Sequence, residues 1–429
     1  MAEVKPFAGL LYNSEKINGD YSGVMAPPYD VISREEQDEL YEKSDCNIVR
    51  LILGRVLESD DADNNKYTRA GALLDEWQKQ GVLKRDDIPA FYVYVQEYDY
   101  KGETCRRIGF IGLMKIGEPG NDPVLPHEYT LAKPKEDRLN LIKQVKTNLS
   151  PIFTLYEDSQ GIIPQILEQG IFEADPIIDV DIKGIVHRFW SLSDRKSVDA
   201  IVSRMNGRKA FIADGHHRYE VARMYRDLRR KDEGYDGSAD YLMVYFSAFN
   251  SNNDLTVMAT HRVVKNMPFE GQSKIGAKLG EYFSVEEYSG LSELMGRLEK
   301  EIDDDHAFGY FDGKQHYFAK AKDKDKLLGI IKEEKTFAWK NLDVSMLHAV
   351  VFNNLLSIDE AEGNISYARD PETAEQFVKS GEYKTAFFLN PTRVEQLKAV
   401  AESGEMMPQK STYFYPKLLT GLVINKHGQ

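Results

Sequence analysis

The chain has 429 residues, 42% of them hydrophobic and 29% charged, which is the composition of a globular protein with one large domain or a few smaller ones. Its formal net charge of -14 argues against binding to nucleic acid or to an anionic membrane, because both need a positive protein face. Since the two cysteines, Cys46 and Cys105, form no CxxC pair and no apolar run approaches the roughly 20 residues of a membrane span, we expect a cytoplasmic protein without a disulfide framework or a zinc knuckle.

The first polar element of interest follows a pair of prolines. Pro27 and Pro28 fix an extended segment that presents Asp30 on a stiff loop. The capping box Ser33–Glu36 then starts a helix that we predict over residues 33–44. Asp30 is therefore either a simple turn residue or a carboxylate placed for work as a general base or metal ligand.

The next elements are predicted as strands. The apolar run at residues 47–54 indicates a buried strand that ends at a glycine. Arg50 within this run must be paired or belong to a site, because an unpaired buried charge is too costly. Alternating side chains at residues 91–98 and 107–115 predict two further strands joined by a hairpin.

A dense polar stretch precedes and opens the helix predicted over residues 135–147. A charge-rich helix start is by itself only a solvated cap. This stretch, however, mixes metal ligands with phosphate donors within twelve positions, and the mixture favours a site. Its members are His127, Glu128, Lys133, Lys135, Glu136, Asp137 and Arg138.

The strongest candidate is the polar turn Asp214–Arg218, between a strand predicted at 209–213 and a helix predicted at 219–230. Gly215 allows a positive φ and a close backbone approach, the helix start offers N–H groups with a partial positive charge, and Arg218 adds a donor fork that suits phosphate. Taken singly, these residues also suit a helix cap, a core histidine or a salt bridge. An anion site accounts best for the group, with the aspartate orienting a histidine or holding a metal ion.

Beyond the turn, residues 241–250 predict a fully buried strand. His261 and Arg262 then repeat the His-Arg pair of the turn and are expected to close on the same anion. Residues 266–429 alternate helix and strand patterns. Near their end, Lys410–Thr412 suits a phosphate or carboxylate as well as it suits packing at an edge strand.

Five motifs in this order resemble the bacterial and archaeal family of domain of unknown function 1015, over residues 4–426. They are Ala26–Asp30, Pro126–Glu128, Lys133–Arg138, Ala213–Tyr219 and Lys410–Lys417. Tyr129 departs from the pattern, where a smaller or charged residue is expected, and it bears on substrate fit. More distantly, Gly215–Arg218 is similar to the Gly-x-His-Arg element of the ParB and sulfiredoxin-like fold, in which a strand-to-helix turn binds nucleotide phosphates.

The resemblance implies a mixed α/β (α+β) chain. Residues 1–265 would form a ParB/sulfiredoxin-like nucleotide-binding core with inserted helices and hairpins, and residues 266–429 a C-terminal α/β portion packing on it. That fold includes the free serine kinases, which move a phosphoryl group from a nucleotide to free L-serine, and genes of the family tend to lie beside serine-biosynthesis genes.

We therefore expect a nucleotide-dependent phosphotransferase that acts on a small hydroxyl metabolite, with free L-serine as the leading acceptor, ATP or ADP as nucleotide and Mg²⁺ as metal. The same site run backwards would dephosphorylate phosphoserine. Asp30, His216 and His217 are the expected catalytic residues; Asp214, Gly215, His216, His217 and Arg218 would bind phosphates; Arg50, Lys133, Arg138, His261 and Arg262 would bind substrate or neutralise charge; Glu128 and Asp137 would hold Mg²⁺.

Other classes remain open. A metal-dependent phosphohydrolase or nuclease would use His127, His216 and His217 with acidic residues as metal ligands. A non-catalytic, nucleotide-binding regulator is disfavoured by the net charge of -14 and by the lack of a basic helix-turn-helix. A sulfiredoxin-like reductase fits least, because neither cysteine lies in a candidate site. The oligomeric state is open, a homodimer included.

Overall fold

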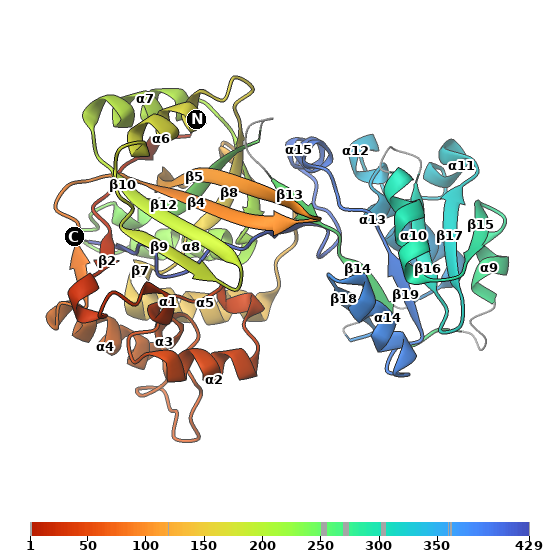
Figure 1. The fold of residues 1–429 in the computed structure, drawn as a ribbon, viewed down its shortest axis with the longest axis horizontal. Coiled ribbons are helices and arrows are strands. Elements are labelled where there is room, and N and C mark those ends of the chain that lie inside the picture. The colour runs from red at the N-terminus through yellow and green to blue at the C-terminus, as the bar shows by residue number, and fades with distance from the viewer. Residues whose placement is uncertain are drawn as a thin grey trace. The chain divides into compact units, whose positions relative to one another are not determined.

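The computed structural model describes residues 2–118, 120–249, 255–268, 274–301, 306–358, 360 and 363–428. The chain divides into two compact units (Figure 1). The first comprises Met1–Leu125, Thr130–Leu255 and Pro416–Gln429, and the second comprises Pro126–Tyr129 and Thr256–Tyr415. The chain thus leaves the first unit twice and returns to it at its end, whereas the sequence suggested a single boundary after residue 265. Each unit is built of strands and helices, which confirms the expected mixed α/β class.

A nine-stranded mixed sheet forms the centre of the first unit, in the order β6-β11-β8-β12-β5-β4-β10-β9 with β1 beside β5. Most neighbouring strands are antiparallel, but β11 runs parallel to β6 and β12 runs parallel to β8. The strands are β1 (Val4–Lys5), β4 (Phe91–Tyr100), β5 (Glu103–Lys115), β6 (Val124–Leu125), β8 (Ile152–Glu157), β9 (Ile178–Ile182), β10 (Ile185–Leu192), β11 (Ala210–Asp214) and β12 (Tyr241–Phe249). The expected hairpin between β4 and β5 is present.

The two faces of this sheet differ in chemistry because successive strand residues point to opposite sides. On β4, Val93 and Val95 belong to the apolar core, which the helices α6 (Ile162–Ile171) and α7 (Arg195–Met205) complete. The alternate residues Tyr94 and Gln96 are equally buried and contact the returning C-terminal segment instead. This second face is therefore polar as well as buried.

Six more helices belong to the first unit: α1 (Tyr21–Val24), α2 (Arg34–Lys43), α3 (Val49–Ile52), α4 (Lys66–Lys79), α5 (Ala132–Val145) and α8 (His216–Arg229). Short strand pairs join β2 (Leu10–Tyr12) to β3 (Leu83–Arg85) and β7 (Thr147–Asn148) to β21 (Asn425–Lys426). The predicted cap of α2 is confirmed, since the Glu36 N–H donates to Ser33 Oγ over 3.1 Å.

The strand predicted at residues 47–54 is wrong, because the chain forms the short helix α3 there. Asn47 starts it: its side-chain oxygen accepts the Val49 N–H over 2.9 Å, and its amide group donates to the carbonyls of Gly23 and Met25. Ile48, Val49, Leu51 and Ile52 are buried. Because these apolar residues are nearly continuous, the periodicity of so short a run does not distinguish a helix from a strand.

The second unit contains a six-stranded antiparallel sheet in the order β15-β17-β16-β19-β14-β18. One face packs on α10 and α14 through a core that includes Leu294 and Ala374. The strands are β13 (Thr256–Met258), β14 (His261–Val264), β15 (Phe283–Tyr288), β16 (Ala307–Phe311), β17 (His316–Ala321), β18 (Ile365–Ala368), β19 (Thr385–Phe388) and β20 (Tyr413–Tyr415). The helices are α9 (Lys274–Leu279), α10 (Leu291–Leu298), α11 (Lys324–Leu328), α12 (Phe337–Lys340), α13 (Asp343–Met346), α14 (Pro371–Lys379) and α15 (Val394–Glu402), with a π-helix over Leu347–Leu356. None of the helices described is both long and apolar enough to cross a membrane.

Candidate functional site

The candidate site is built around the junction of β11 and α8. Gly215 joins the two elements with a φ of +97°, a left-handed conformation that residues with a Cβ adopt only under strain. A Cβ at this position would lie 2.9 Å from Ile152 Cγ2 and 3.0 Å from Arg218 Nη2. The turn therefore requires glycine for both its backbone and its space, and it leads directly into the first turn of a 14-residue helix, the kind of helix end that can bind anions.

Asp214 sits at the end of β11 between two cations. Its carboxylate accepts Lys417 Nζ at Oδ1 over 2.5 Å and Arg218 Nη2 at Oδ2 over 2.8 Å. Burial raises the pKa of Asp214, but Lys417 and Arg218 lower it by more, so the net pKa lies well below the ordinary aspartate value. Asp214 is thus an ionised residue that holds two positive groups beside the turn, not a helix cap.

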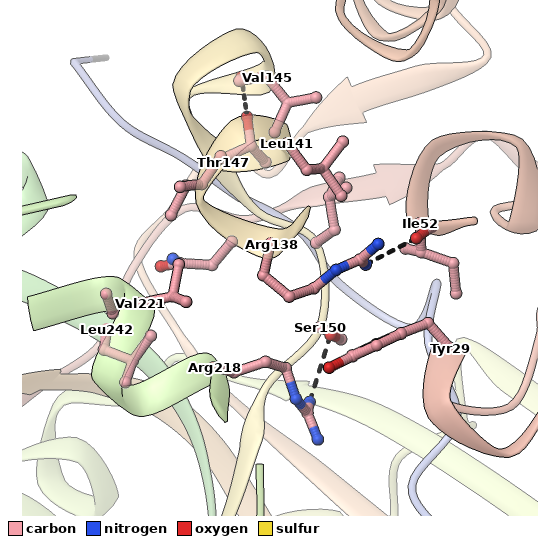
Figure 2. A pocket seen from close by; sticks show the side chains of 14 residues that line it. Tyr29, Ile52, Arg138, Leu141, Val145, Thr147, Ser150, Arg218, Val221 and Leu242 are labelled. Carbon is pink, nitrogen blue, oxygen red and sulfur yellow. Dashed lines mark hydrogen bonds between the residues drawn. The ribbon is translucent and has the colours of Figure 1, made fainter. Parts of the chain in front are cut away.

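Arg218 reaches from the first turn of α8 back to the segment before β8. Its Nη1 group donates to Ser150 Oγ over 3.2 Å and to the Pro151 carbonyl. Figure 2 shows its guanidinium group beside the Tyr29 hydroxyl, at the end of the pocket where Ser150 lies. The arginine that the sequence placed at the centre of the site is therefore held in one direction by contacts on two sides.

The two histidines differ in environment, as expected. His216 is buried, with 6% of its surface exposed, while His217 is half-buried. His217 Nε2 accepts the backbone N–H of Leu131 over 2.9 Å, so that nitrogen carries no proton and the neutral ring has its proton on Nδ1. This contact joins the start of α8 to the start of α5, and Glu220 strengthens the junction by accepting Thr130 Oγ1 and Lys135 Nζ.

A cavity of about 70 Å³ lies next to the turn. Aliphatic side chains form most of its wall, and two guanidinium groups, a phenol, two aliphatic hydroxyls and an amide supply its polar part (Figure 2). Its lining residues are Tyr29, Ile52, Arg138, Leu141, Ile142, Val145, Thr147, Asn148, Leu149, Ser150, Arg218, Val221, Ala222 and Leu242. The second polar stretch of the sequence thus meets the turn through Arg138, whose guanidinium carbon lies 4.0 Å above the centre of the Tyr29 ring.

Asp137, which the sequence suggests as a magnesium ligand, is bonded to three side chains. One carboxylate oxygen accepts Lys66 Nζ over 2.6 Å and the Tyr67 hydroxyl over 2.8 Å, and the other accepts Arg138 Nε over 2.9 Å. Burial raises the pKa of Asp137, but Arg138 and Lys66 lower it by a larger amount, so the net pKa is about 2. This carboxylate orients Arg138, which also donates to the Ile52 carbonyl over 2.7 Å, and it already has the cationic partners that a metal ion would replace.

Three other predicted residues of the first unit lie nearby or apart. Asp30 is exposed in a single 3₁₀ turn, Tyr29–Val31, directly after a residue that lines the cavity. Lys133 is exposed in the first turn of α5. Arg50 serves a local purpose, because it donates to the Tyr41 carbonyl over 2.7 Å and pairs with Asp45 over 2.9 Å.

The remaining predicted residues belong to the second unit. His261 Nδ1 accepts the Leu389 N–H, and Arg262, 1% exposed, donates to the carbonyls of Thr260, Gln409 and Lys410. Glu128 accepts the Lys410 N–H over 2.9 Å, and His127 Nε2 contacts Thr412 Oγ1 over 3.0 Å. Glu128 and Asp137, the proposed magnesium pair, thus belong to different units, and within the described residues no three or more metal-ligating side chains cluster.

Sequence reasoning missed three residues of the site. Lys417 was quoted within a motif but given no role, although its ammonium group pairs with Asp214. Tyr29 lies within the Ala26–Asp30 motif and Ser150 belongs to none of the five motifs, and neither was given a role, yet both line the cavity. A basic residue right after a proline in the aromatic run Tyr413–Pro416 was the available signal for Lys417, since a rigid segment holds a charge in a fixed direction.

Several solved structures are similar to this chain at low identity. A free serine kinase in complex with AMP is 16% identical with a TM-score of 0.33, over 68% of this chain and 83% of the kinase. A conserved hypothetical protein from Pyrococcus furiosus is 15% identical with a TM-score of 0.33, over 69% of this chain and 89% of that protein. SbnI from Staphylococcus aureus, truncated at its C-terminus, is 11% identical with a TM-score of 0.33, over 73% of this chain and 86% of that protein. Likeness at this level says nothing about the chemistry of this chain.

No curated protein sequence matches the chain. The family model described as "Protein of unknown function (DUF1015)" matches residues 4–345, which cover the β11–α8 turn, the cavity and most of the second unit. The motif-based resemblance is thereby confirmed over residues 4–345, which contain four of the five motifs, and the chain belongs to the DUF1015 family.

Proposed function

We propose that the protein is a nucleotide-dependent phosphotransferase that acts on a small hydroxyl metabolite. The observation that carries the proposal is the Gly215 turn, which presents the N-terminus of α8 next to a cavity lined by Arg138 and Arg218. Phosphoryl transfer depends mainly on positioning and on neutralising negative charge, and these elements supply both. The small size of the cavity favours a small acceptor.

The phosphates of the nucleotide would bind at the turn. Lys417 and Arg218 carry two positive charges and Asp214 one negative charge, so the trio has a net charge of +1 before the helix end is counted. The N–H groups of the first helical turn add their partial positive charge. The backbone at Gly215, which has no side chain, allows a phosphate to approach closely.

The acceptor would occupy the cavity. A guanidinium group has five N–H donors, and the contacts of Arg138 to Asp137 and Ile52 use three of them within the described residues. Those of Arg218 to Ser150, Pro151 and Asp214 also use three. The remaining donors suit a substrate carboxylate, and the aliphatic wall suits a short carbon skeleton, so free L-serine is our leading acceptor.

Asp30 is the proposed base that takes the proton of the acceptor hydroxyl. It follows Tyr29 in the same turn, and the charges of Asp30, Arg138 and Arg218 all act on the Tyr29 hydroxyl at the cavity. His217 is not suited to act as a base through Nε2, because the lone pair of that nitrogen accepts the Leu131 N–H. His216 and His217 are proposed instead to shape the phosphate-binding turn.

The contacts of Glu128 and Asp137 do not fit a dedicated magnesium site. Asp137 is bonded to Lys66, Tyr67 and Arg138, and Glu128 is bonded to Lys410. We propose that Mg²⁺ accompanies the nucleotide, bound to its phosphates, when ATP or ADP enters. No step of the proposed chemistry is assigned to a protein-bound metal.

A phosphorus NMR assay tests the function. The protein is incubated with Mg²⁺, ATP or ADP and a panel of hydroxyl metabolites headed by L-serine, beside Arg218→Met and the matched surface control Arg204→Met, whose side chain is exposed on α7. We expect a new phosphomonoester signal with wild type and control and its loss in Arg218→Met. Release of free phosphate without acceptor dependence, or no change in any phosphorus signal, would contradict the proposal.

A further inference from the structure

The segment that carries Lys417 is fastened to the buried polar face of the first sheet. Gln96 Nε2 donates to the Lys417 carbonyl over 3.1 Å, and Arg107 donates to the Pro416 carbonyl. Two buried side chains from neighbouring strands thus hold the backbone carbonyls of the residue before Lys417 and of Lys417 itself.

Arg107 carries a charge in a fully buried position, which is unfavourable in free energy. It is completely buried, and its guanidinium group stacks 4.8 Å from the centre of the Phe153 ring. Its Nη2 group donates both to Gln96 Oε1 and to the Pro416 carbonyl. Gln96 and Arg107 are direct cross-strand partners in β4 and β5, so the side chains form one rigid pair. Burying a charge costs free energy unless its donors are bonded, and here the Pro416 carbonyl is one of those bonds.

The side chain of Lys417 leaves this clamped backbone toward the turn, where its ammonium group meets Asp214 over 2.5 Å. A long lysine side chain normally samples many rotamers. Fixing its backbone reduces the range of directions in which the ammonium group can point. A continuous chain of contacts therefore runs from the middle of the sheet to the anion-binding turn: Arg107 to Gln96, both to the 416–417 backbone, Lys417 to Asp214, and Asp214 to Arg218.

We propose that Lys417 is a further cation of the phosphate-binding site and that Gln96 and Arg107 are its positioning residues. The first half of this assignment rests on the proposed function. An ammonium group has three N–H donors, so its contact with Asp214 is compatible with a second contact to a phosphate oxygen. Because Gln96 and Arg107 hold the backbone at residues 416–417, the Lys417 side chain already points toward the turn before a phosphate binds. This orientation lowers the entropic cost of the second contact.

A double-mutant cycle on ATP affinity tests the assignment. Lys417→Met removes the cation, while Gln96→Glu keeps an acceptor for Arg107 but loses the N–H that holds the Lys417 carbonyl. Measured by calorimetry, Lys417→Met should weaken ATP binding about tenfold and Gln96→Glu about threefold, with Lys417→Arg recovering most of the loss. The double variant should bind no more weakly than Lys417→Met alone.

Full additivity of the two losses would overturn the positioning role, because Gln96 would then act by a path that does not include Lys417. An unchanged affinity in Lys417→Met would overturn the role of the cation. If Gln96→Glu does not fold, Gln96→Met, which has a similar shape and no charge, takes its place in the cycle.

A second readout separates this inference from the proposed function. The NMR signal of the Lys417 ammonium group, recorded without nucleotide, should shift in Gln96→Glu and stay unchanged in Arg204→Met. If wild type binds no ATP, the proposed function fails while this signal still decides the positioning claim. A Lys417 signal that is the same in wild type and Gln96→Glu overturns the claim even if ATP binds.

Discussion

Three places in this chain have a histidine followed directly by an arginine, and two of them, one in each unit, use the pair in opposite ways. In the first unit, His217 and Arg218 open α8 after a glycine with positive φ, and Arg218 lines a cavity. In the second unit, His261 and Arg262 lie inside strand β14, paired with β18 and β19 on both sides, and each is 1% exposed.

The same two residue types therefore have different contacts in the two backbone settings. Arg262 donates hydrogen bonds to the carbonyls of Thr260, Gln409 and Lys410, and burial lowers its pKa to about 10. Arg218 sits where a helix start leaves N–H groups exposed, with a carboxylate to orient it and a cavity beside it. That both pairs close on one anion stays a prediction, and in the strand pair both side chains already have backbone partners.

The largest effect that sharpens this comparison comes from Gly215→Ala. The added Cβ would be strained at a φ of +97° and would press on Ile152 and Arg218, which together should cost about 4 kcal/mol of unfolding free energy. Urea unfolding measures this cost. Gly234→Ala is the matched control, because its φ is +74° but no atom lies within 4 Å of the added Cβ, and it should cost only about 1 kcal/mol. Equal costs for the two variants would refute the close-approach role of Gly215.

A reciprocal pair of arginine substitutions comes next. Arg262→Met leaves several buried carbonyls without a donor and should cost about 3 kcal/mol of stability while leaving the affinity for ATP unchanged. Arg218→Met should instead weaken ATP binding about tenfold or more, equivalent to about 1.4 kcal/mol. Thermal unfolding measures the stability of each variant, and calorimetry measures the affinity of each variant for ATP. A loss of ATP binding in Arg262→Met would contradict the claim that only the first-unit arginine contributes to ATP binding.

The two regions should also lose stability in different pH windows. Burial lowers the pKa of His261 from 6.5 to about 4, so the unfolded chain takes up a proton first and about 3 kcal/mol is lost as the pH falls from 6.5 to 4. Asp137, with its pKa lowered from 3.8 to about 2, contributes about 2 kcal/mol that is present above pH 4 and lost as the pH falls toward 2. Unfolding at a series of pH values checks both. The Asp137→Asn variant should flatten only the lower window, and a change in the upper window would contradict the assignment.

The smallest effect is expected from His217→Ala. It removes the acceptor of the Leu131 N–H and should cost about 1 kcal/mol, with faster amide hydrogen exchange confined to the start of α5. Hydrogen exchange followed by mass spectrometry locates the change. Protection of the α5 start equal to that of wild type would show that this contact does not hold the two helices together.

Local signals predicted much of this structure. An apolar strand, a glycine and a helical pattern in direct succession were enough to place the β11–α8 turn, and the alternation in β4 and β5 was enough for their hairpin. The helix α3 was missed because its four residues lie in a short, nearly continuous apolar run, which has no clear periodicity.

Long-range contacts were out of reach of the same signals. Lys417 lies 203 positions from Asp214, and nothing in either segment's composition predicts that the chain returns to the first unit to join them. Asp137 was read as a metal ligand because its partners Lys66 and Tyr67 come from a helix about 70 positions earlier. Sequence patterns thus found the charged groups, whereas the pairing of those groups, which decides their roles, depended on the tertiary fold.

The most direct test of the phosphate-binding turn is an NMR titration of the protein with ATP, following the ring signals of the histidines and the guanidinium signals of the arginines. We predict that the signals of His217 and Arg218 shift saturably, while those of His261 and Arg262, in the strand of the second unit, stay in place. Shifts at His261 and Arg262 without shifts at His217 and Arg218, or no saturable shift at either pair, would contradict the central claim.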